Sequence, residues 1–170
     1  LDRTEVLVEG IYIKLNATGI NGINMNGGGD IVNGYAPGDS RNSNVNLSAG
    51  SYINFIAKNN FYNYGTVTAS TDLTITANSA LNNYGAIKGG NGTATINVTN
   101  GSFNNAFNTS KLTSNNNLIF NLGDDLNNYG EISVANDITA NVADSFYNYP
   151  TALIWSNRDA TFNVANTFLN

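Results

Sequence analysis

Apolar and polar residues alternate in short stretches along most of the chain. The clearest stretch is TVTASTDLTITA, residues 66–77, which is rich in threonine and β-branched residues. Alternation with a period of two places the apolar side chains on one face of a β-strand, and this composition suits a pleated surface. Nowhere do the apolar residues follow the spacing of a helix. The pattern therefore predicts an all-β protein built from short strands.

These strands belong to a repeat. A large apolar residue opens each unit, the units follow one another in steps of 20, 22, 23, 20 and 22 residues, and an asparagine always stands two positions after the opening residue. The opening residues are Phe61, Leu81, Phe103, Leu126, Phe146 and Phe168, and the last asparagine is Asn170. A unit of this size is too small to bury its own apolar face, so the units must stack on one another.

Stacking predicts a parallel β-helix, or β-solenoid, in which each coil has about 20–23 residues and strands of successive coils pair about 4.8 Å apart. Roughly six coils are expected. The segment KGGNG, residues 88–92, is expected to be a loop that absorbs differences in coil length. An antiparallel sandwich or an array of hairpins is the alternative fold, although neither would require the same residues at a fixed phase.

The first 44 residues are less regular than residues 45–170. Glycine, asparagine and proline interrupt every apolar run in residues 19–40, so residues 1–44 predict degenerate coils, a loop excursion or a cap. Short strands are predicted at Glu5–Val8 and Ile11–Leu15, and a tight turn at Asn33-Gly34. Because the unit that opens at Phe168 stops after three residues, we expect the chain to be truncated in the middle of a repeat.

The recurrent asparagine predicts a structural ladder inside the coils. An amide at the same position of every coil can donate to one neighbouring copy and accept from the other. The predicted ladder contains Asn63, Asn83, Asn105, Asn128 and Asn148. The glycines at Gly65, Gly85 and Gly130 are expected to supply a positive φ at a turn.

Four tyrosines share one phase and form the candidate ligand-contact row: Tyr64, Tyr84, Tyr129 and Tyr149. Ala106 is expected to interrupt this row. One hypothesis is structural, in which aromatic rings one coil apart stack and cover the turn. The other is functional, in which exposed rings contact a carbohydrate or a receptor. The period alone does not determine the direction of these side chains.

Composition excludes several kinds of chemistry. The chain has neither cysteine nor histidine, so thiolate sites, His-bound zinc and Ser-His-Asp catalysis are excluded. Its net charge of −5 and its scattered cations argue against nucleic acid as a partner, and no apolar run predicts membrane insertion.

The nearest acidic cluster contains Asp124, Asp125, Asp137 and Asp144, but the period forces no catalytic pair. We therefore expect no enzyme, no cofactor and no metal site, including at the single NGGGD segment of residues 26–30. An ice-binding array is not expected either, because threonine does not recur at one phase.

Residues 45–170 resemble the repeats of filamentous haemagglutinin-like exoproteins of bacterial two-partner secretion systems, which include adhesins and contact-dependent inhibition effectors. The resemblance rests on LNNYG at residues 81–85 and 126–130 and FYNYG at residues 61–65, with a β-branched residue two positions after each glycine, at Ile87, Ile132 and Val67. The segment FNNAFN, residues 103–108, and Pro150 depart from this signature. The resemblance implies a right-handed β-helical filament that is secreted to the bacterial cell surface.

Three functional hypotheses follow. The first is a structural and adhesive shaft segment of a long secreted bacterial cell-surface filament, whose partners are neighbouring coils of the same longer chain and a host or bacterial cell-surface receptor or glycan. The second is a receptor- or glycan-binding module that uses the loop of residues 19–44 or the tyrosine row. The third is a carbohydrate-active β-helix of the tailspike type.

Overall fold

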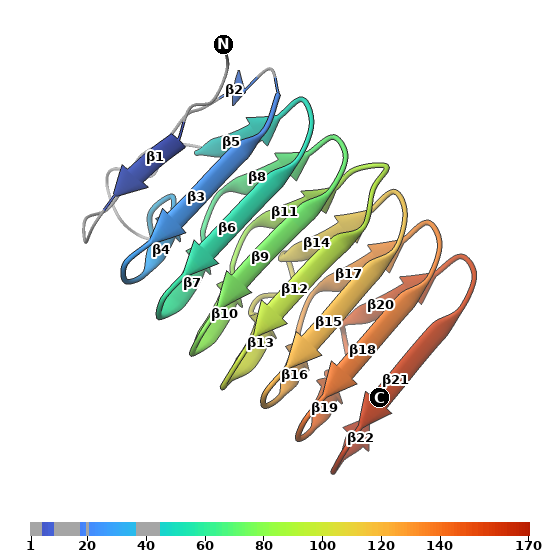
Figure 1. Ribbon diagram of the computed structural model, residues 1–170. Helices are drawn as coiled ribbons and strands as arrows, with labels where there is room; N and C mark the ends of the chain where they lie inside the picture. Colours follow the sequence, from blue (N-terminus) through green and yellow to red (C-terminus); the bar gives the residue numbers. More distant parts are fainter. Residues whose placement is uncertain (1–4, 9–17, 20, 37–44) are drawn as a thin grey trace.

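The fold is a parallel β-helix, as the repeat predicts. The computed structural model describes residues 5–8, 18–19, 21–36 and 45–170, and these residues form strands and turns but no helix. All strand pairs among them are parallel, and each pairs strands of successive coils. The strands line up as three sheets that run along the stack of coils (Figure 1).

The strands occupy the same three sheets in every coil. The first sheet has eight strands: β1 (Glu5–Val8), β3 (Ile23–Gly27), β6 (Ile53–Ala57), β9 (Leu73–Ala77), β12 (Ala94–Val98), β15 (Leu118–Leu122), β18 (Ile138–Val142) and β21 (Ala160–Val164). The second sheet has seven: β4 (Ile31–Asn33), β7 (Asn60–Asn63), β10 (Ala80–Asn83), β13 (Ser102–Asn105), β16 (Leu126–Asn128), β19 (Phe146–Asn148) and β22 (Phe168–Leu169). The third sheet also has seven: β2 (Thr18–Gly19), β5 (Asn46–Ala49), β8 (Thr66–Ala69), β11 (Ala86–Gly89), β14 (Lys111–Ser114), β17 (Glu131–Val134) and β20 (Leu153–Ser156).

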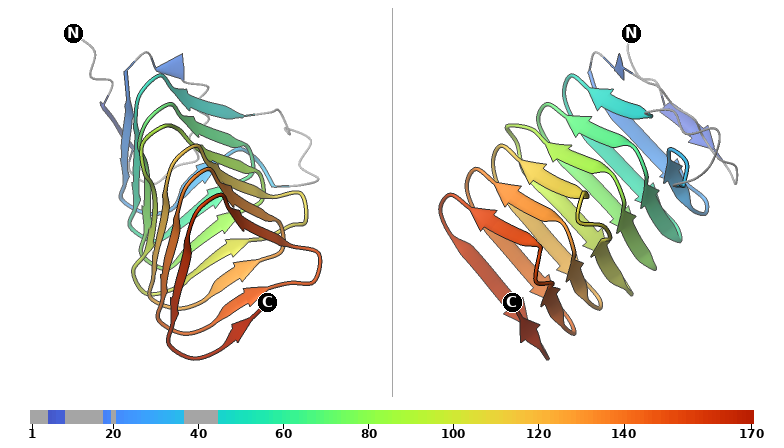
Figure 2. Two further views of the ribbon diagram at one scale, coloured as in Figure 1. Left: turned by 90° about the vertical axis from the view of Figure 1, so that its right-hand side faces the viewer. Right: turned by 180° about the vertical axis from the view of Figure 1, so that it is seen from behind.

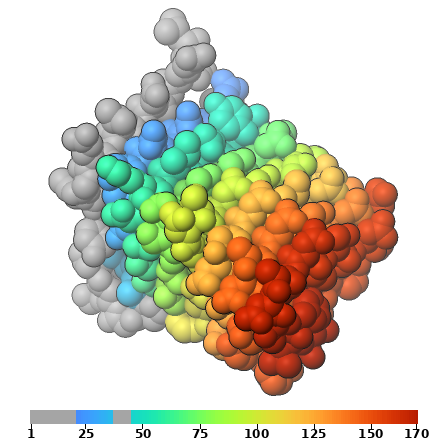
Figure 3. Space-filling model, turned by 60° about the horizontal axis from the view of Figure 1, so that its bottom comes forward, coloured from blue at the N-terminus to red at the C-terminus, as the bar shows by residue number. Residues whose placement is uncertain are grey.

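Each coil passes through the first, second and third sheet in turn. The complete coils run from β6 to β8, β9 to β11, β12 to β14, β15 to β17, and β18 to β20. Seen obliquely along the stack, successive coils follow one another with the same three-sided outline (Figure 2, left). The space-filling view shows the coils as successive bands across the surface (Figure 3). Strand residues inside the stack therefore have neighbours at the same position in the coils before and after them.

The core consists of apolar rows that follow the strand register. In β9, Leu73, Ile75 and Ala77 are buried, whereas the intervening threonines are partly exposed. The same alternation recurs in every strand of the first sheet from β3 to β18. The pairing register places each buried residue opposite the buried residue at the same position in the next coil. Each buried position therefore forms an apolar row that runs through the stack.

Phenylalanines reinforce the contact between the first and second sheets. Phe55 packs against Phe61 with ring centroids 5.6 Å apart, and Phe103 packs against Phe120 at 5.2 Å. Phe146 and Phe162 form a third pair, also at 5.2 Å. Such pairs add to the free energy gained from apolar burial by about 0.5–1.5 kcal/mol each. The opening residue of the repeat is thus a core residue in each of these coils.

Residues 21–36 extend the regular stack. Strand β3 pairs in register with β6, and β4 pairs with β7, so that Asn33 lies opposite Asn63. The predicted turn at Asn33-Gly34 is present, with a φ of +88° at Gly34. The predicted strand at Glu5–Val8 is β1, whereas the predicted strand at Ile11–Leu15 lies outside the described residues.

The loop predicted at residues 88–92 is shorter than expected. Lys88 and Gly89 belong to strand β11, where they pair with Thr113 and Ser114. Only Gly90, Asn91 and Gly92 lie in the turn. The prediction of a longer loop was wrong because glycine is rare inside strands. Here Gly89 faces inward, and a Cβ atom on it would lie 2.8 Å from the Cβ of Ala94.

The predicted positive φ at the recurrent glycines is wrong. Among the described residues only Gly34 has a positive φ, so Gly65, Gly85 and Gly130 are not required for that reason. A Cβ atom on each would instead collide with a carbonyl oxygen of the coil before it. At Gly85 this carbonyl belongs to Gly65, and it accepts a hydrogen bond from the amide of Ala86. Glycine is needed here because two backbones approach each other closely.

We expect Gly85→Ala to lower the free energy of unfolding by about 1–3 kcal/mol, because the new methyl group overlaps the backbone of the neighbouring coil. Gly29→Ala is the matched control, since a Cβ atom there meets nothing within 4 Å and φ is not positive. Urea denaturation followed by circular dichroism measures both changes. Equal stability of the two variants would contradict the close-approach explanation.

Candidate functional site

The predicted asparagine ladder runs through the interior of the second sheet. Each Nδ2 donates to the Oδ1 of the asparagine in the next coil, over distances of 2.7–2.9 Å. The ladder joins Asn33, Asn63, Asn83, Asn105, Asn128, Asn148 and Asn170. It is therefore longer than the predicted ladder by Asn33 at one end and Asn170 at the other.

The ladder also binds the backbone of the third sheet. The second N–H of Asn63 donates to the carbonyl of Ala86 at 3.1 Å, and that of Asn83 donates to the carbonyl of Lys111 at 3.0 Å. Asn63, Asn83, Asn105 and Asn128 are completely buried. A buried amide is costly unless its polar atoms are hydrogen-bonded, and the repeat satisfies them with identical neighbours.

A recognisable signal for Asn33 was present in the sequence. Ile31 and Asn33 repeat the apolar residue and the asparagine of the later units, but 30 residues separate Ile31 from Phe61 instead of 20–23. The longer connection hid the phase. Among the described residues, the Oδ1 of Asn33 is a buried side-chain acceptor without a hydrogen-bond partner, at the end of the described ladder.

Further amide rows lie on the outside. On the first sheet, Asn163, Asn141 and Asn121 each donate to the asparagine of the preceding coil, ending at Asn97, over 2.9–3.0 Å. On the second sheet, Asn127 donates to Asn104, and Asn104 to Asn82. These outer rows, together with the buried ladder, explain much of the asparagine content, 34 of the 170 residues.

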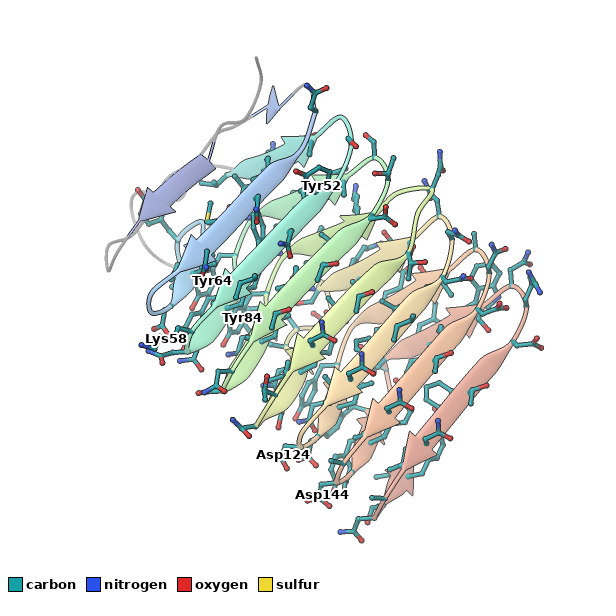
Figure 4. The ribbon with its side chains drawn as sticks, in the orientation of Figure 1. Tyr52, Lys58, Tyr64, Tyr84, Asp124 and Asp144 are labelled. Carbon is teal, nitrogen blue, oxygen red and sulfur yellow. The ribbon has the colours of Figure 1, made fainter. Side chains whose placement is uncertain are left out.

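The candidate tyrosines form stacked pairs along one corner of the coils. Tyr64 and Tyr84 stack with ring centroids 4.7 Å apart, and Tyr129 and Tyr149 stack at 3.8 Å. Tyr64 and Tyr84 come from adjacent coils (Figure 4). Tyr129 is 39% exposed, whereas the other three are only partly exposed. Within each pair the stacking covers one face of each ring, and Phe107 also packs against Tyr84.

The predicted interruption of the tyrosine row at Ala106 is wrong on the side of Tyr84, where another aromatic ring continues the row. Ala106 occupies the backbone position of Tyr84, because its amide donates to the carbonyl of Asn83 as that of Tyr84 donates to Asn63. However, the ring of the next residue, Phe107, lies 5.1 Å from that of Tyr84. The chain bulges at residues 107–109 before Ser110 returns it to the coil, so an inserted aromatic residue replaces the missing tyrosine.

Tyr149 shares a hydrogen bond with Tyr129 that changes its pKa. A hydrogen bond with Tyr129, with smaller contributions from burial and nearby groups, raises the pKa of Tyr149 to about 12. Burial and the charge of Asp30 also raise the pKa of Tyr62. These phenols are protonated at neutral pH, so none of them is suited to act there as a base.

The structure gathers three of the four candidate carboxylates. Oxygen atoms of Asp124, Asp125 and Asp144 lie within 4.8 Å of one another, at adjacent turns (Figure 4). Each accepts a hydrogen bond from a turn or from the first residue of a strand, such as that from Ser102 Oγ to Asp124 at 3.0 Å. This is the group that could hold a cation, but its observed contacts are those of turn caps.

The other candidate acids lie apart and bind the backbone of the next coil. Asp137 accepts from the amide of Asp159 at 3.2 Å and pairs with Arg158 at 3.5 Å. In the NGGGD segment, Asp30 accepts from the amide of Asn60 at 2.9 Å. These carboxylates act as caps for turns of the following coil.

The expectation that threonine does not recur at one phase is also wrong. Thr74 pairs with Thr95, and Thr139 pairs with Thr161, all at one position on the outer face of the first sheet. Ile119 separates the two pairs. The unequal coil lengths hide this row in the sequence, because only the hydrogen-bond register aligns the coils.

Comparisons with known proteins add no further assignment: no protein-family model, no curated protein and no solved structure matches the chain. The resemblance to filamentous haemagglutinin-like repeats therefore stays a prediction. None of the described segments is a helix that is long and apolar enough to cross a membrane.

We expect Asn105→Ala to lower the free energy of unfolding by about 3 kcal/mol, because Asn83 Nδ2 and Asn128 Oδ1 both lose a buried partner. Asn104→Ala is the matched control in the same strand. It also removes two amide contacts, but on the outer face, where water replaces them, so its cost should stay below about 1 kcal/mol. Urea denaturation of both variants tests the ladder, and a smaller loss for Asn105→Ala would refute it.

The Tyr129–Tyr149 pair should make stability depend on alkaline pH. Because the pKa of Tyr149 rises from about 10 in the unfolded chain to about 12 in the folded one, the contribution of the pair is present below pH 10 and is lost as the pH rises toward 12. Tyr129→Phe removes the hydroxyl partner and should flatten this dependence. Thermal midpoints measured between pH 9 and 12 compare the two proteins, and parallel curves would argue against the coupling.

Proposed function

We propose that this chain is a structural shaft segment of a long secreted filament on a bacterial cell surface, and that adhesion uses its outer faces. The observation that supports this proposal best is the continuous asparagine ladder, in which every coil is both donor and acceptor for its neighbours. A module of this kind repeats without a built-in limit, because each coil offers the next the same bonds that it has received.

The contacts between coils suit a mechanical role. Backbone hydrogen bonds of three sheets, apolar rows and the buried ladder all cross every boundary between complete coils. A force along the axis would act on all three kinds of contact at once, and each boundary between complete coils has the same three kinds. The stacked tyrosines add to the same boundaries, which favours their structural interpretation over the ligand-contact one.

The uncharged outer amides suit exposure outside the cell. Only 11% of the residues are charged, and rows of asparagine and threonine lie along much of the outer face of the first sheet. Such side chains keep the surface hydrated without relying on charge that salt would screen. Together with the repeat signature of residues 45–170, this surface supports a filament rather than an enzyme.

Immunogold electron microscopy of cells that produce the protein tests this proposal. Antibodies raised against the purified chain should label extended filaments outside the outer surface, and a strain without the coding sequence should show no label. Label confined to the cell interior would refute the proposal. In a parallel assay, the purified chain should release no reducing sugar from bacterial surface polysaccharides, and release would favour the tailspike hypothesis instead.

A further inference from the structure

The outer face of strand β20 differs from those of β5, β8, β11, β14 and β17 in the third sheet. Alternation along β20 turns Ile154 toward the core and turns Leu153 and Trp155 outward. Leu153 is 51% exposed and Trp155 49% exposed. Trp155 is the sole tryptophan of the chain. Two large apolar side chains thus lie side by side on the outer face, where they do not contribute to the core.

The corresponding outward positions in the other coils carry small or polar side chains. They are Asn46 and Ser48, Thr66 and Thr68, Ala86 and Lys88, Lys111 and Thr113, and Glu131 and Ser133. The outward direction of Trp155 follows from strand alternation. A further coil paired with β20 would cover its backbone edge and Ile154, but it would leave Trp155 on the outer face.

Register places a compact set of polar groups beside the tryptophan. Glu131 lies opposite Leu153, and Ser133 lies opposite Trp155. One strand further, Lys111 and Thr113 occupy the same two positions. Neighbouring strands are about 4.8 Å apart, so all six side chains fall within one small area. We call it the Trp155 patch: Lys111, Thr113, Glu131, Ser133, Leu153 and Trp155.

The charges of the Trp155 patch are paired with each other. Lys111 Nζ lies 3.0 Å from Glu131 Oε2, and Ser133 Oγ donates to Glu131 Oε1 at 2.8 Å. These hydrogen bonds lower the pKa of Glu131, so the carboxylate is ionised at neutral pH. The patch therefore has no net charge, on a chain whose net charge is −5. Such a surface does not attract a polyanion, and it matches a neutral, polar ligand.

We propose that the Trp155 patch binds a neutral polysaccharide chain. A pyranose ring has C–H groups on one face and hydroxyl groups around its edge. The negative face of an indole ring attracts the C–H face, while paired charges and hydroxyls beside it exchange hydrogen bonds with the sugar edge. The patch provides both features: an outward indole and, one and two strands away, fixed donors and acceptors.

The Trp155 patch is better suited to sugar stacking than the tyrosine row. Each ring of the Tyr64–Tyr84 and Tyr129–Tyr149 pairs already has one face covered by its partner. In the described part of the chain, no aromatic ring packs against Trp155. Sugar binding at this patch does not require the filament role, so either proposal can fail while the other stands.

The sole tryptophan makes binding directly measurable. We expect titration of the whole chain with neutral hexasaccharides of cellulose, chitin and mannan to give a saturable change in tryptophan emission with at least one of them. Because a single ring and a few hydrogen bonds bury little area, the dissociation constant should be about 1 mM. Glu131→Gln should weaken binding by about tenfold, because it removes a charged acceptor and its bond to Lys111.

Saturation-transfer NMR, which observes the sugar, extends the test to variants without tryptophan. Trp155→Ser should abolish transfer while circular dichroism shows a retained fold. Ile56→Ser is the matched control, since Ile56 is an exposed apolar residue on the outer face of the first sheet, and it should leave transfer unchanged.

Three results would overturn the proposal. The first is undiminished transfer to Trp155→Ser. The second is loss of transfer in a folded Tyr129→Ala variant that keeps Trp155, because the tyrosine row would then be the site. The third is an emission change with neutral lipid vesicles or apolar peptides but with none of the sugars, because the patch would then be an apolar docking surface.

Discussion

Buried amide hydrogen bonds between identical asparagines constrain this fold more tightly than any other contact. An amide inside an apolar core is tolerated only when both its donor and its acceptor are satisfied. Here each asparagine obtains its partners from the coils before and after it, and its second N–H reaches the backbone of the third sheet. A shift of a single residue in one coil would break bonds in two others, so the ladder locks the register of the whole stack.

The remaining contacts follow from that register. Apolar residues at equivalent positions form continuous rows, and phenylalanines join the first sheet to the second. The same alignment brings backbones so close at Gly65, Gly85 and Gly130 that no side chain fits. Where glycine is missing from this position, the chain lengthens: residues 107–109 bulge before Ser110, and Pro150 and Thr151 do so before Ala152. Both bulges let the next strand regain its partner.

Because the ladder and the apolar rows hold the coils together, the outward positions are free to vary. Most carry asparagine, threonine or serine, which hydrate the surface and pair with their own copies in neighbouring coils. The Trp155 patch interrupts this texture with an apolar pair and a paired charge. A regular scaffold with a local exception on its surface is what the proposed shaft role requires. Under that proposal the core specifies the shaft, and outward residues such as those of the Trp155 patch determine what it contacts.

The sequence by itself determined the fold, the coil length, the apolar rows and the asparagine ladder from Asn63 onward. These features depend on a period, and a period is visible without coordinates because stacking demands the same residue type at the same phase. Asn33 escaped because its coil is longer than the others, and the function of the glycines was misjudged because φ and close approach favour the same residue. Only the tertiary structure decided that Phe107 replaces a tyrosine, that Asp124, Asp125 and Asp144 meet, and that Trp155 faces outward. Phe107 lies in an insertion and Trp155 in an apolar run without alternation, so the hydrogen-bond register, and not the residue count, sets their neighbours. Asp124 and Asp144 lie one coil of 20 residues apart, but the period does not fix the direction of a side chain at a turn.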